Sequence, residues 1–265
     1  MHEKYFAANQ KLWDAKTGIH VDSAFYDMSG FLKGKNSLRK IELAELPDLK
    51  GKTVLHSQCH FGQDTLSMQR MGAQCTGIDL SSKAIAMARQ YNSQLGLNAK
   101  FVQCNVFDID KHIDEQFDLV FTSYGVLGWL PDMEKWATQM ASRVKEGGMF
   151  YIVEFHPTMY MFDWNDYKVG YPYFYEKEPT KEVEIGTYAD RESDIELEEY
   201  FWQHHMGEII QALIEQGLEV VSFQEYDYSP YQIFGKEVKR ANQEYLFPVN
   251  NVNIPLTFSL KCIKK

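Results

Sequence analysis

The sequence predicts an α/β fold built on one doubly wound, mostly parallel sheet of seven strands. Short β-rich runs alternate with helical runs from about residue 51 to residue 157, and such alternation favours parallel strands joined by right-handed crossovers. The length of 265 residues is enough to bury the core of one large α/β domain, or of one domain with an insertion.

The first 50 residues lie outside this alternation and predict a helical segment. Apolar residues and Asn9 recur at helical spacing between Tyr5 and Lys16, which predicts an amphipathic helix. A glycine-bearing stretch follows, then a second helix that runs to Leu46, and "PDLKGK" forms a turn. We expect residues 1–50 to act as an N-terminal helical lid.

The alternating core begins with the β-rich run "TVLHSQC", a helix "QDTLSMQRMG" that stops at Gly72, and a second strand "AQCTGID". Ser81 is the predicted N-cap of the next helix, which Gly96 ends. The runs "AKFVQCN", "FDLVFTSY" and "MFYIVEF" predict the third, fourth and fifth strands, with a helix opened by Pro131 before the fifth. Ligand sites of parallel sheets lie at the carboxyl ends of the strands, which here are Ser57–Gly62, Asp79, Asn105, Ser123–Tyr124 and Glu154–His156.

An aromatic-rich and acidic stretch after Pro157 breaks the alternation. It contains alternating segments such as "DIELEEYFW", so we expect an insertion over 158–205 that is partly a β-hairpin. Long connections beside a site often act as lids, and we assign this one as a substrate lid. The helix "MGEIIQALIEQG" and the strands "LEVVSFQEY" and "PLTFSLKCIKK" complete a core made of residues 51–157 and 206–265.

Composition narrows the class of protein. The formal net charge is −10, which disfavours docking onto the phosphate backbone of nucleic acids. No apolar run reaches the length of a membrane span, and the N-terminal residues lack the apolar region of a secretory signal. The four cysteines show no C-x-x-C pairing. We therefore expect a cytoplasmic protein with no nucleic-acid or membrane partner, and the oligomeric state stays open.

The order strand, loop, helix, strand and acid indicates a cofactor site. Gly62 opens the first core helix, whose N-terminus offers unpaired N–H groups, and Asp79 ends the second strand, where a carboxylate can accept both hydroxyls of a ribose. The loop "CHFGQD" carries one glycine, whereas a pyrophosphate site requires G-x-G-x-x-G. A nicotinamide-dependent oxidoreductase is therefore disfavoured.

The strings "VLHSQCHFG", "GIDLS", "FVQCN", "FDLVFTSYGVLGWL" and "VKEGGMFYIVEFHP" occur in the order of the landmarks of another family. Over about residues 52–156 the chain resembles class I S-adenosylmethionine-dependent methyltransferases of the small-molecule type, in particular a bacterial subgroup with a QCHFG form of the first motif. The resemblance implies a Rossmann-like sheet whose last strand is antiparallel. It also implies S-adenosylmethionine as cofactor, S-adenosylhomocysteine as product, and no metal.

The resemblance assigns cofactor roles residue by residue. Loop 57–62 would wrap the methionine end, Asp79 would hold the ribose, and Asn105 would meet the adenine amino group. The implied cofactor-binding residues are Ser57, Gln58, Cys59, His60, Gly62, Asp79, Leu80, Asn105, Val106 and Ser123.

Three residues depart from the family pattern. His56 replaces the usual acid, and Gln58 and His60 replace two glycines. A side chain at a glycine position matters because glycine allows positive φ and close approach of the backbone. Either the backbone there is ordinary, or the loop sits differently around the cofactor. The side chains of Gln58 and His60 are then expected to contact the cofactor where relatives use bare backbone.

The catalytic candidates are His156, His204 and Tyr124. Either histidine is a possible general base, since histidine titrates near neutral pH, and either is equally a structural residue. Alternatives remain for other residues: Asp79 as a helix cap, Asn105 as a turn residue, and Trp129, Trp164 and Trp202 as core residues. A metal site at His56, Cys59 and His60 is disfavoured because the spacing matches no standard ligand set.

The hypothesis is therefore an enzyme that transfers the methyl group of S-adenosylmethionine to a small-molecule acceptor. The alternative is a non-catalytic S-adenosylmethionine-binding protein on the same scaffold. A nucleic-acid methyltransferase is disfavoured by the charge and by the lack of an N/D-P-P-Y-type motif.

Overall fold

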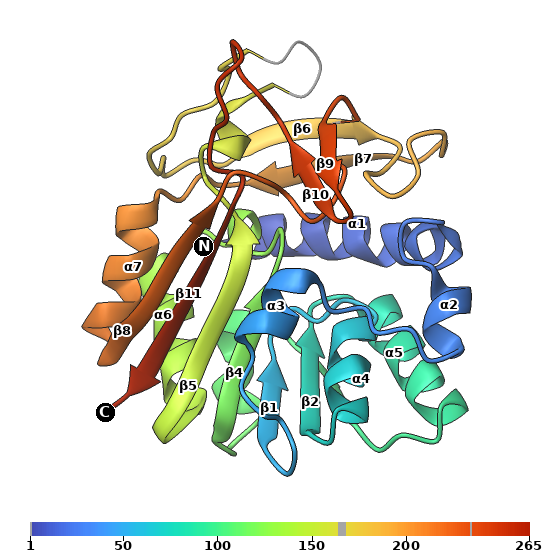
Figure 1. Cartoon of the computed structure of the whole chain (residues 1–265), viewed down its shortest axis with the longest axis vertical. Helices are drawn as coiled ribbons and strands as arrows, with labels where there is room; N and C mark the ends of the chain where they lie inside the picture. Colours follow the sequence, from blue (N-terminus) through green and yellow to red (C-terminus); the bar gives the residue numbers. More distant parts are fainter. Residues whose placement is uncertain (1, 164–167, 234) are drawn as a thin grey trace.

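The computed structural model describes residues 2–163, 168–233 and 235–265. Its centre is a seven-stranded sheet with the order β3-β2-β1-β4-β5-β11-β8 (Figure 1). The strands are β1 (Thr53–His56), β2 (Gln74–Asp79), β3 (Lys100–Gln103), β4 (Phe117–Ser123), β5 (Val144–Phe155), β8 (Leu218–Tyr226) and β11 (Thr257–Lys264). Strands β1 to β5 pair in parallel, and β11 runs antiparallel to both β5 and β8. The predicted seven-stranded sheet with an antiparallel last strand is confirmed.

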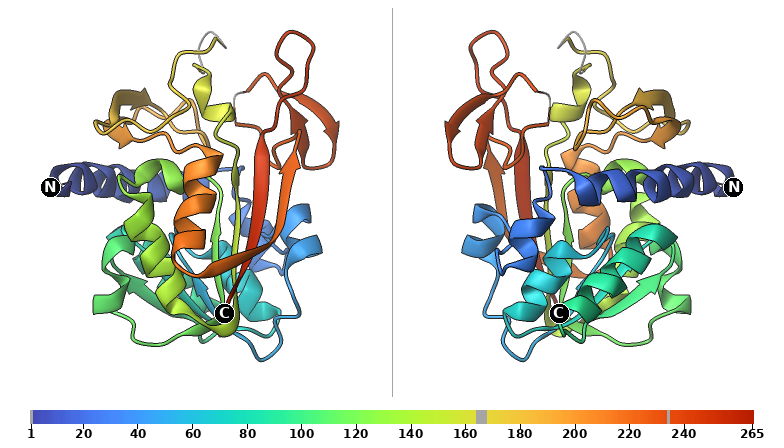
Figure 2. Two further views of the ribbon diagram at one scale, coloured as in Figure 1. Left: turned by 90° about the vertical axis from the view of Figure 1, so that its left-hand side faces the viewer. Right: turned by 90° about the vertical axis from the view of Figure 1, so that its right-hand side faces the viewer.

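Helices cover both faces of the sheet (Figure 2). On one face lie α4 (Gln63–Arg70) and α5 (Ser82–Gln94), which share a buried apolar cluster with α3 (Lys40–Glu45). On the other face lie α6 (Met133–Arg143), α7 (Met206–Glu215) and the 3-10 turn η1 (Val106–Lys111), whose cluster centres on the fully buried Trp136. Because successive strand residues point to opposite faces, neighbours such as Val54 and Leu55 enter different clusters.

The helix boundaries differ from the predicted ones where capping decides them. The first helix, α1, extends over Glu3–Asp22. The predicted helix to Leu46 is present as α3, and a further short helix, α2 (Met28–Leu32), lies within the glycine-bearing stretch before it, where Gly34 turns the chain with a φ of 106°. Helix α6 begins after Asp132, whose side chain accepts a hydrogen bond from the Lys135 N–H, and not at Pro131.

Two hairpins stand above the carboxyl edge of the sheet (Figure 1). One, β6 (Thr180–Ile185) paired with β7 (Glu196–Phe201), falls in the predicted insertion. The other, β9 (Val238–Ala241) paired with β10 (Glu244–Leu246), lies between β8 and β11, where the sequence pattern indicated no element. A small apolar cluster of Met159, Phe162, Ile233, Phe247 and Leu256 joins the segments that carry the two hairpins.

Helix α1 lies across the carboxyl edge of the sheet, below the β6–β7 hairpin (Figure 1). The side chain of Asn9 makes two hydrogen bonds with the backbone of Tyr200 in β7, donating to its carbonyl at 2.8 Å and accepting from its N–H at 3.1 Å. The Asp14 carboxylate accepts hydrogen bonds from the Ser81 hydroxyl at 2.6 Å and from the Lys83 N–H at 3.0 Å. Helix α1 is thus fastened to the hairpin above it and to the start of α5 below it.

Candidate functional site

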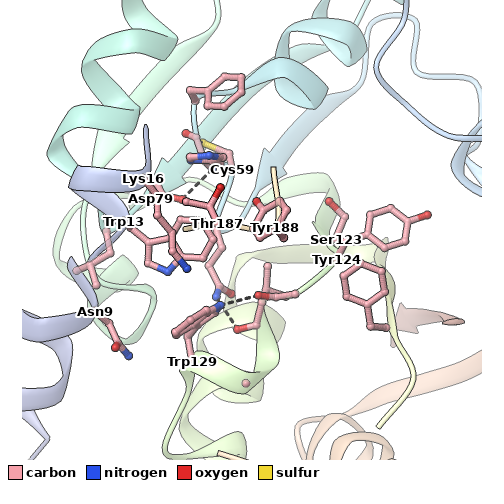
Figure 3. Close-up of a pocket in the computed structure, with 18 of the residues that line it drawn as sticks. Asn9, Trp13, Lys16, Cys59, Asp79, Ser123, Tyr124, Trp129, Thr187 and Tyr188 are labelled. Atoms are coloured by element: carbon pink, nitrogen blue, oxygen red, sulfur yellow. Dashed lines mark hydrogen bonds between the residues drawn. The ribbon is translucent and has the colours of Figure 1, made fainter. Parts of the chain in front are cut away.

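A cavity of about 740 Å³ opens at the carboxyl ends of β1 to β4. Its floor is made by the loops that follow these strands, and its roof by α1 and the β6–β7 hairpin. Figure 3 shows Trp13 and Lys16 of α1 together with Trp129, Asp79 and Tyr188 around this cavity. The position matches the expectation for parallel sheets, in which ligands bind at the carboxyl edge.

The loop after β1 has the backbone shape of a glycine loop without the glycines. Gln58 has a φ of 54° and His60 a φ of 50°, so both residues are in the left-handed region. This conformation costs a non-glycine residue about 1–2 kcal/mol. Of the two possibilities raised by the sequence, an ordinary backbone is therefore wrong at these positions.

Side chains of the same two residues hold the loop in place. The Gln58 amide donates a hydrogen bond to the Val126 carbonyl at 3.0 Å, which ties the loop to the segment after β4. The His60 Nε2 atom lies 2.9 Å from the His20 Nδ1 atom of α1, at hydrogen-bond distance. These contacts offset the backbone strain, because such strain persists only where the surroundings over-determine it.

Position 62 of the loop still carries a glycine, unlike positions 58 and 60. It has a φ of 79° directly before α4, and a Cβ atom there would lie 2.7 Å from Cε1 of Phe101 and 3.1 Å from Cβ of Ala88. Any side chain would therefore push α5 and β3 away from the loop. Glycine is needed here for conformation and for space.

Asp79 lies at the end of β2 and lines the cavity. Its Oδ2 accepts a hydrogen bond from the His60 N–H and its Oδ1 one from the Ser81 N–H, both at 2.8 Å. The N-cap of α5 is Ser81, whose hydroxyl accepts from the Ala84 N–H at 3.0 Å, so Asp79 is not the cap. Burial raises the Asp79 pKa to about 6. Each carboxylate oxygen keeps further capacity to accept a hydrogen bond.

Leu80, Asn105 and Val106 also line the cavity, beside Asp79. The Asn105 side-chain oxygen accepts a hydrogen bond from the Phe107 N–H at 3.0 Å and caps η1. The turn role considered for Asn105 is therefore present in the structure, on a residue that also faces the cavity.

Two residues of the loop differ in their exposure to the cavity. Cys59 lines it, and burial raises the pKa of its thiol, which keeps the thiol neutral. Ser57 is fully buried beneath the loop and does not line the cavity, and its N–H donates to the Phe121 carbonyl at 2.8 Å. Ser57 therefore shapes the loop from below.

Ser123 and Tyr124 line the cavity after β4. Tyr124 has a φ of 34°, and its hydroxyl donates a hydrogen bond to Oε2 of Glu42 at 2.9 Å. Glu42 is fully buried, and burial raises its pKa to about 7. No sequence signal points to Glu42, because an acid in a short amphipathic helix is usually solvated.

Glu154, at the end of β5, is used by the backbone of the neighbouring loop. Its carboxylate accepts hydrogen bonds from the N–H groups of Gly125, of Val126 at 2.7 Å, of Leu127 at 3.4 Å and of Phe155 at 2.6 Å. A carboxylate with this many backbone donors is a structural anchor for the segment after β4.

The structure places both candidate histidines away from the cavity wall. The His156 Nε2 lies 2.9 Å from Glu225, and its Nδ1 lies 2.9 Å from the Thr158 hydroxyl. The His204 Nε2 donates to the Leu130 carbonyl at 2.7 Å, and its Nδ1 lies 3.1 Å from Glu208. Neither histidine lines the cavity, and the nitrogens of both rings are engaged with neighbouring residues, so the structure does not bring His156 and His204 together with the other predicted site residues.

The tryptophans divide between wall and core. Trp129 lines the cavity and donates its indole N–H to the Gly125 carbonyl at 2.7 Å, and Trp202 lines it while 2% exposed. Trp164 lies outside the described residues. In the described part of the chain, no three histidine, cysteine, aspartate or glutamate side chains converge in a way that would hold a metal ion.

Residues 54–148 match a family model described as a methyltransferase domain. A curated relative, the ubiquinone biosynthesis O-methyltransferase of Aeromonas salmonicida, is 28% identical over 149 residues, which are 55% of this chain and 62% of the relative. The chain thus spans less than two thirds of the length of such relatives.

Two solved structures have a similar fold. One is an S-adenosylmethionine dependent methyltransferase from Mesorhizobium loti, with a TM-score of 0.57, 18% identity, and coverage of 87% of this chain and 99% of that one. The other is described as a DhpI–SAH complex, with a TM-score of 0.59, 15% identity, and coverage of 100% of this chain and 98% of that one.

Proposed function

We propose that this protein is an S-adenosylmethionine-dependent methyltransferase that acts on a small molecule. Its residues 54–148 match a methyltransferase domain, and its fold is that of the class I enzymes. The observation that carries the proposal is the position of Asp79. Its carboxylate faces the cavity beside a loop that keeps the glycine-type backbone at Gln58 and His60. This strained shape persists without glycine, which indicates that the shape itself is needed.

The residues on the cavity wall fit the cofactor. Asp79 offers acceptor capacity to the two hydroxyls of a ribose, and Leu80 and Val106 offer apolar surface to a purine ring. The loop between Gln58 and Gly62 passes below the place for the methionine end. When bound, S-adenosylmethionine supplies a methyl group on a positively charged sulfur, so the protein mainly has to align the acceptor and exclude water.

The roof supports the exclusion of water. Trp13 of α1 packs edge-on against Trp129 with 5.4 Å between the ring centroids, and the hydroxyls of Tyr26 and Tyr188 lie 2.6 Å apart. Helix α1 and the β6–β7 hairpin therefore close the cavity together. The proposal that 1–50 and 158–205 act as lids rests on these contacts, and ligand exchange would require the roof to open.

Tyr124 and Glu42 are proposed to hold the proton that an acceptor would lose. Tyr124 lines the cavity, and its hydroxyl donates to Glu42, whose pKa of about 7 allows it to receive a proton near neutral pH. A proton from an acceptor would move to the Tyr124 oxygen while the Tyr124 hydrogen passes to Oε2 of Glu42. This pair takes the place that the sequence had suggested for His156 and His204.

A cavity of about 740 Å³ and a net charge of −10 support a small-molecule acceptor over a nucleic acid. Within the described part of the chain, none of the helices has the length and apolar character needed to cross a lipid bilayer. A cytoplasmic location is part of the proposal.

Isothermal titration with S-adenosylhomocysteine tests the proposal directly. We expect one site per chain, and we expect S-adenosylmethionine to be consumed when phenols, amines, thiols and carboxylic acids are offered as acceptors. Binding without turnover would support the non-catalytic alternative. If neither nucleoside binds to the folded protein, the proposal is wrong.

A further inference from the structure

We propose that the acceptor is a flat aromatic molecule with a ring hydroxyl, and that five aromatic side chains of the cavity wall hold it. These side chains, which we call the aromatic chamber, are Phe25, Tyr124, Phe155, Tyr160 and Tyr231. Because the inference names the class of acceptor, it rests on the proposed function.

The rings of the aromatic chamber form one continuous surface. The ring centroid of Tyr124 lies 5.4 Å from that of Phe155 and 5.1 Å from that of Tyr231. Phe155 in turn lies 6.4 Å from Tyr160, and Tyr231 stacks on Phe25 at 5.3 Å with 15° between the ring planes. These are the separations at which aromatic side chains attract one another. The fold thus gathers rings from distant parts of the chain on one wall.

The aromatic chamber is a wall of the cavity and not part of the packed core. All five of its side chains line the cavity and are half-buried, whereas core rings such as Trp136, Phe121 and Tyr151 are fully buried. Part of each chamber ring is therefore uncovered and available to a ligand in the cavity. Uncovered apolar surface that gathers in a concave place is typical of a binding site.

The aromatic chamber lies apart from the residues proposed to hold the cofactor. Asp79 and Asn105 follow β2 and β3, whereas Tyr124 and Phe155 lie at the ends of β4 and β5, and β1 separates the two pairs of strands in the sheet. Figure 3 shows Asp79 and Tyr124 on different sides of the cavity. Four of the five chamber residues also lie outside the matched range 54–148. The chamber is therefore built mainly from segments outside the matched methyltransferase domain.

The surface of the aromatic chamber favours a flat, uncharged ring over other ligands. Aromatic rings pack face to edge or in offset stacks against one another, and a puckered saturated ring cannot make these contacts. A cationic ligand is disfavoured because the guanidinium of Arg39 already lies 4.2 Å from the ring centroid of Tyr231 and would repel it.

The hydroxyl of Tyr160 gives the aromatic chamber a polar contact. Tyr160 lies in the 3-10 turn η3 (Met159–Met161), and its backbone carbonyl accepts a hydrogen bond from the Gln203 amide at 3.1 Å. Its hydroxyl has no hydrogen-bond partner among the described residues, and it lies 3.9 Å from the place that a Cβ would take on Gly125. Burial raises the pKa of Tyr160 well above its ordinary value, so the hydroxyl stays protonated. A hydroxyl on the ligand ring can accept from it or donate to it.

The test measures dissociation constants by ligand-observed NMR on protein saturated with S-adenosylhomocysteine. The probes are phenol, toluene, cyclohexanol and tetramethylammonium. Phenol and toluene differ by a hydroxyl on the same ring, and phenol and cyclohexanol differ by aromaticity with the same hydroxyl. We expect phenol to bind about 2- to 10-fold more tightly than toluene or cyclohexanol, and tetramethylammonium to bind most weakly.

Two variants separate the hydroxyl from the rings. Tyr160→Phe should weaken phenol binding about 2- to 10-fold and leave toluene binding unchanged, whereas Phe155→Leu should weaken both by a similar factor. Tyr175→Phe is the matched control, because the Tyr175 hydroxyl donates to the Pro131 carbonyl at 3.1 Å and the residue does not line the cavity. This control should leave all affinities unchanged, and all three variants should bind S-adenosylhomocysteine as wild type does.

Several results would overturn the inference while leaving the proposed function intact. One is that the protein binds S-adenosylhomocysteine but none of the four probes. Another is that cyclohexanol binds as tightly as phenol, or tetramethylammonium more tightly, because the rings would then not select an aromatic ligand. Unchanged phenol binding by Tyr160→Phe would also overturn it, since the ring hydroxyl would have no partner there. If S-adenosylhomocysteine itself does not bind to the folded protein, the proposed function and this inference fail together.

Discussion

His20 of α1 and His60 of the loop after β1 share one hydrogen bond between ring nitrogens 2.9 Å apart. Burial lowers the pKa of both rings, to about 2 for His20 and about 3 for His60, so both are neutral at physiological pH. One ring donates and the other accepts, which two neutral imidazoles can do in complementary tautomers. The contact couples the roof of the cavity to the loop after β1, which holds Gln58 and His60 in the left-handed region.

The variants His60→Gly and His20→Ala separate the backbone strain at position 60 from the hydrogen bond that joins the loop to α1. Glycine at position 60 removes the left-handed strain of about 1–2 kcal/mol but also the contact with α1, whereas His20→Ala removes the contact and leaves the strain. We expect faster hydrogen exchange in α1 for both variants and a lower free energy of unfolding only for His20→Ala. Unchanged exchange in residues 3–22 would show that the contact does not hold the roof.

Buried neutral histidines make the protein sensitive to acid. The folded pKa of His56 is about 3 and its ordinary value about 6.5, so the unfolded chain binds more protons between these values. Stability from His56 is present above pH 6.5 and is lost as the pH falls toward 3, by about 2 kcal/mol at pH 5. Urea unfolding of wild type and His56→Asn should give a difference that shrinks by this amount between pH 7 and pH 5. A difference that does not vary with pH would contradict the assignment.

The contribution of Glu42 to stability depends on pH in the opposite direction. Its folded pKa of about 7 lies above the ordinary value of about 4.3, so the folded chain binds more protons between them and loses stability as the pH rises through this window. Glu42→Gln removes the charge and keeps an acceptor for Tyr124. We expect the variant to gain about 3 kcal/mol relative to wild type between pH 4.5 and pH 8, measured by urea unfolding. A constant difference would place the Glu42 pKa near its ordinary value.

Gly62→Ala tests whether glycine is needed at position 62 for space, for its positive φ, or for both. Gly217→Ala is the matched control, since Gly217 has a φ of 77° but no atom within 4 Å of the place that a Cβ would take. The control should cost about 1–2 kcal/mol of unfolding free energy from strain alone. Gly62→Ala should cost about 1–3 kcal/mol more, because the new methyl group meets Phe101. Equal losses would mean that Phe101 moves aside freely.

Asp79→Asn tests the proposed ribose contact. Asparagine keeps one of the two backbone hydrogen bonds that the carboxylate accepts, whereas alanine would release both the His60 and the Ser81 N–H groups. We expect S-adenosylhomocysteine to bind about 10- to 100-fold more weakly, because hydrogen bonds to a charged acceptor are the strong ones. Asp132→Asn, at the exposed N-cap of α6, should bind as wild type does. Unchanged affinity of Asp79→Asn would remove Asp79 from the site.

The sheet was predictable because hydrophobic periodicity and glycine stops record it directly. The position of Asp79 was predictable for the same reason, since strand ends of a parallel sheet meet at one edge. The shape of loop 57–62 was not predictable, because residue identity alone does not determine the sign of φ at Gln58 and His60. Contacts with residues distant in sequence, His20 and Val126, decide it.

His156 shows a second limit of prediction from the sequence. His156 does follow β5 at the expected edge, but its side chain bonds to Thr158 and faces Glu225. The position of a residue along a strand shows at which edge of the sheet it lies, but it does not show where its side chain points. Glu42 is the reverse case, a residue with no motif that tertiary packing buries beside Tyr124.

The two hydrogen bonds between Asn9 and Tyr200 have a consequence for aggregation. They cover the outward-facing N–H and carbonyl groups of Tyr200 in β7, a strand that pairs only with β6 among the described strands. An uncovered edge of this kind is a template for pairing with another chain. If the roof opens for ligand exchange as proposed, each opening exposes this edge of β7, and ligands that keep the roof shut should also reduce aggregation in concentrated solutions of the protein.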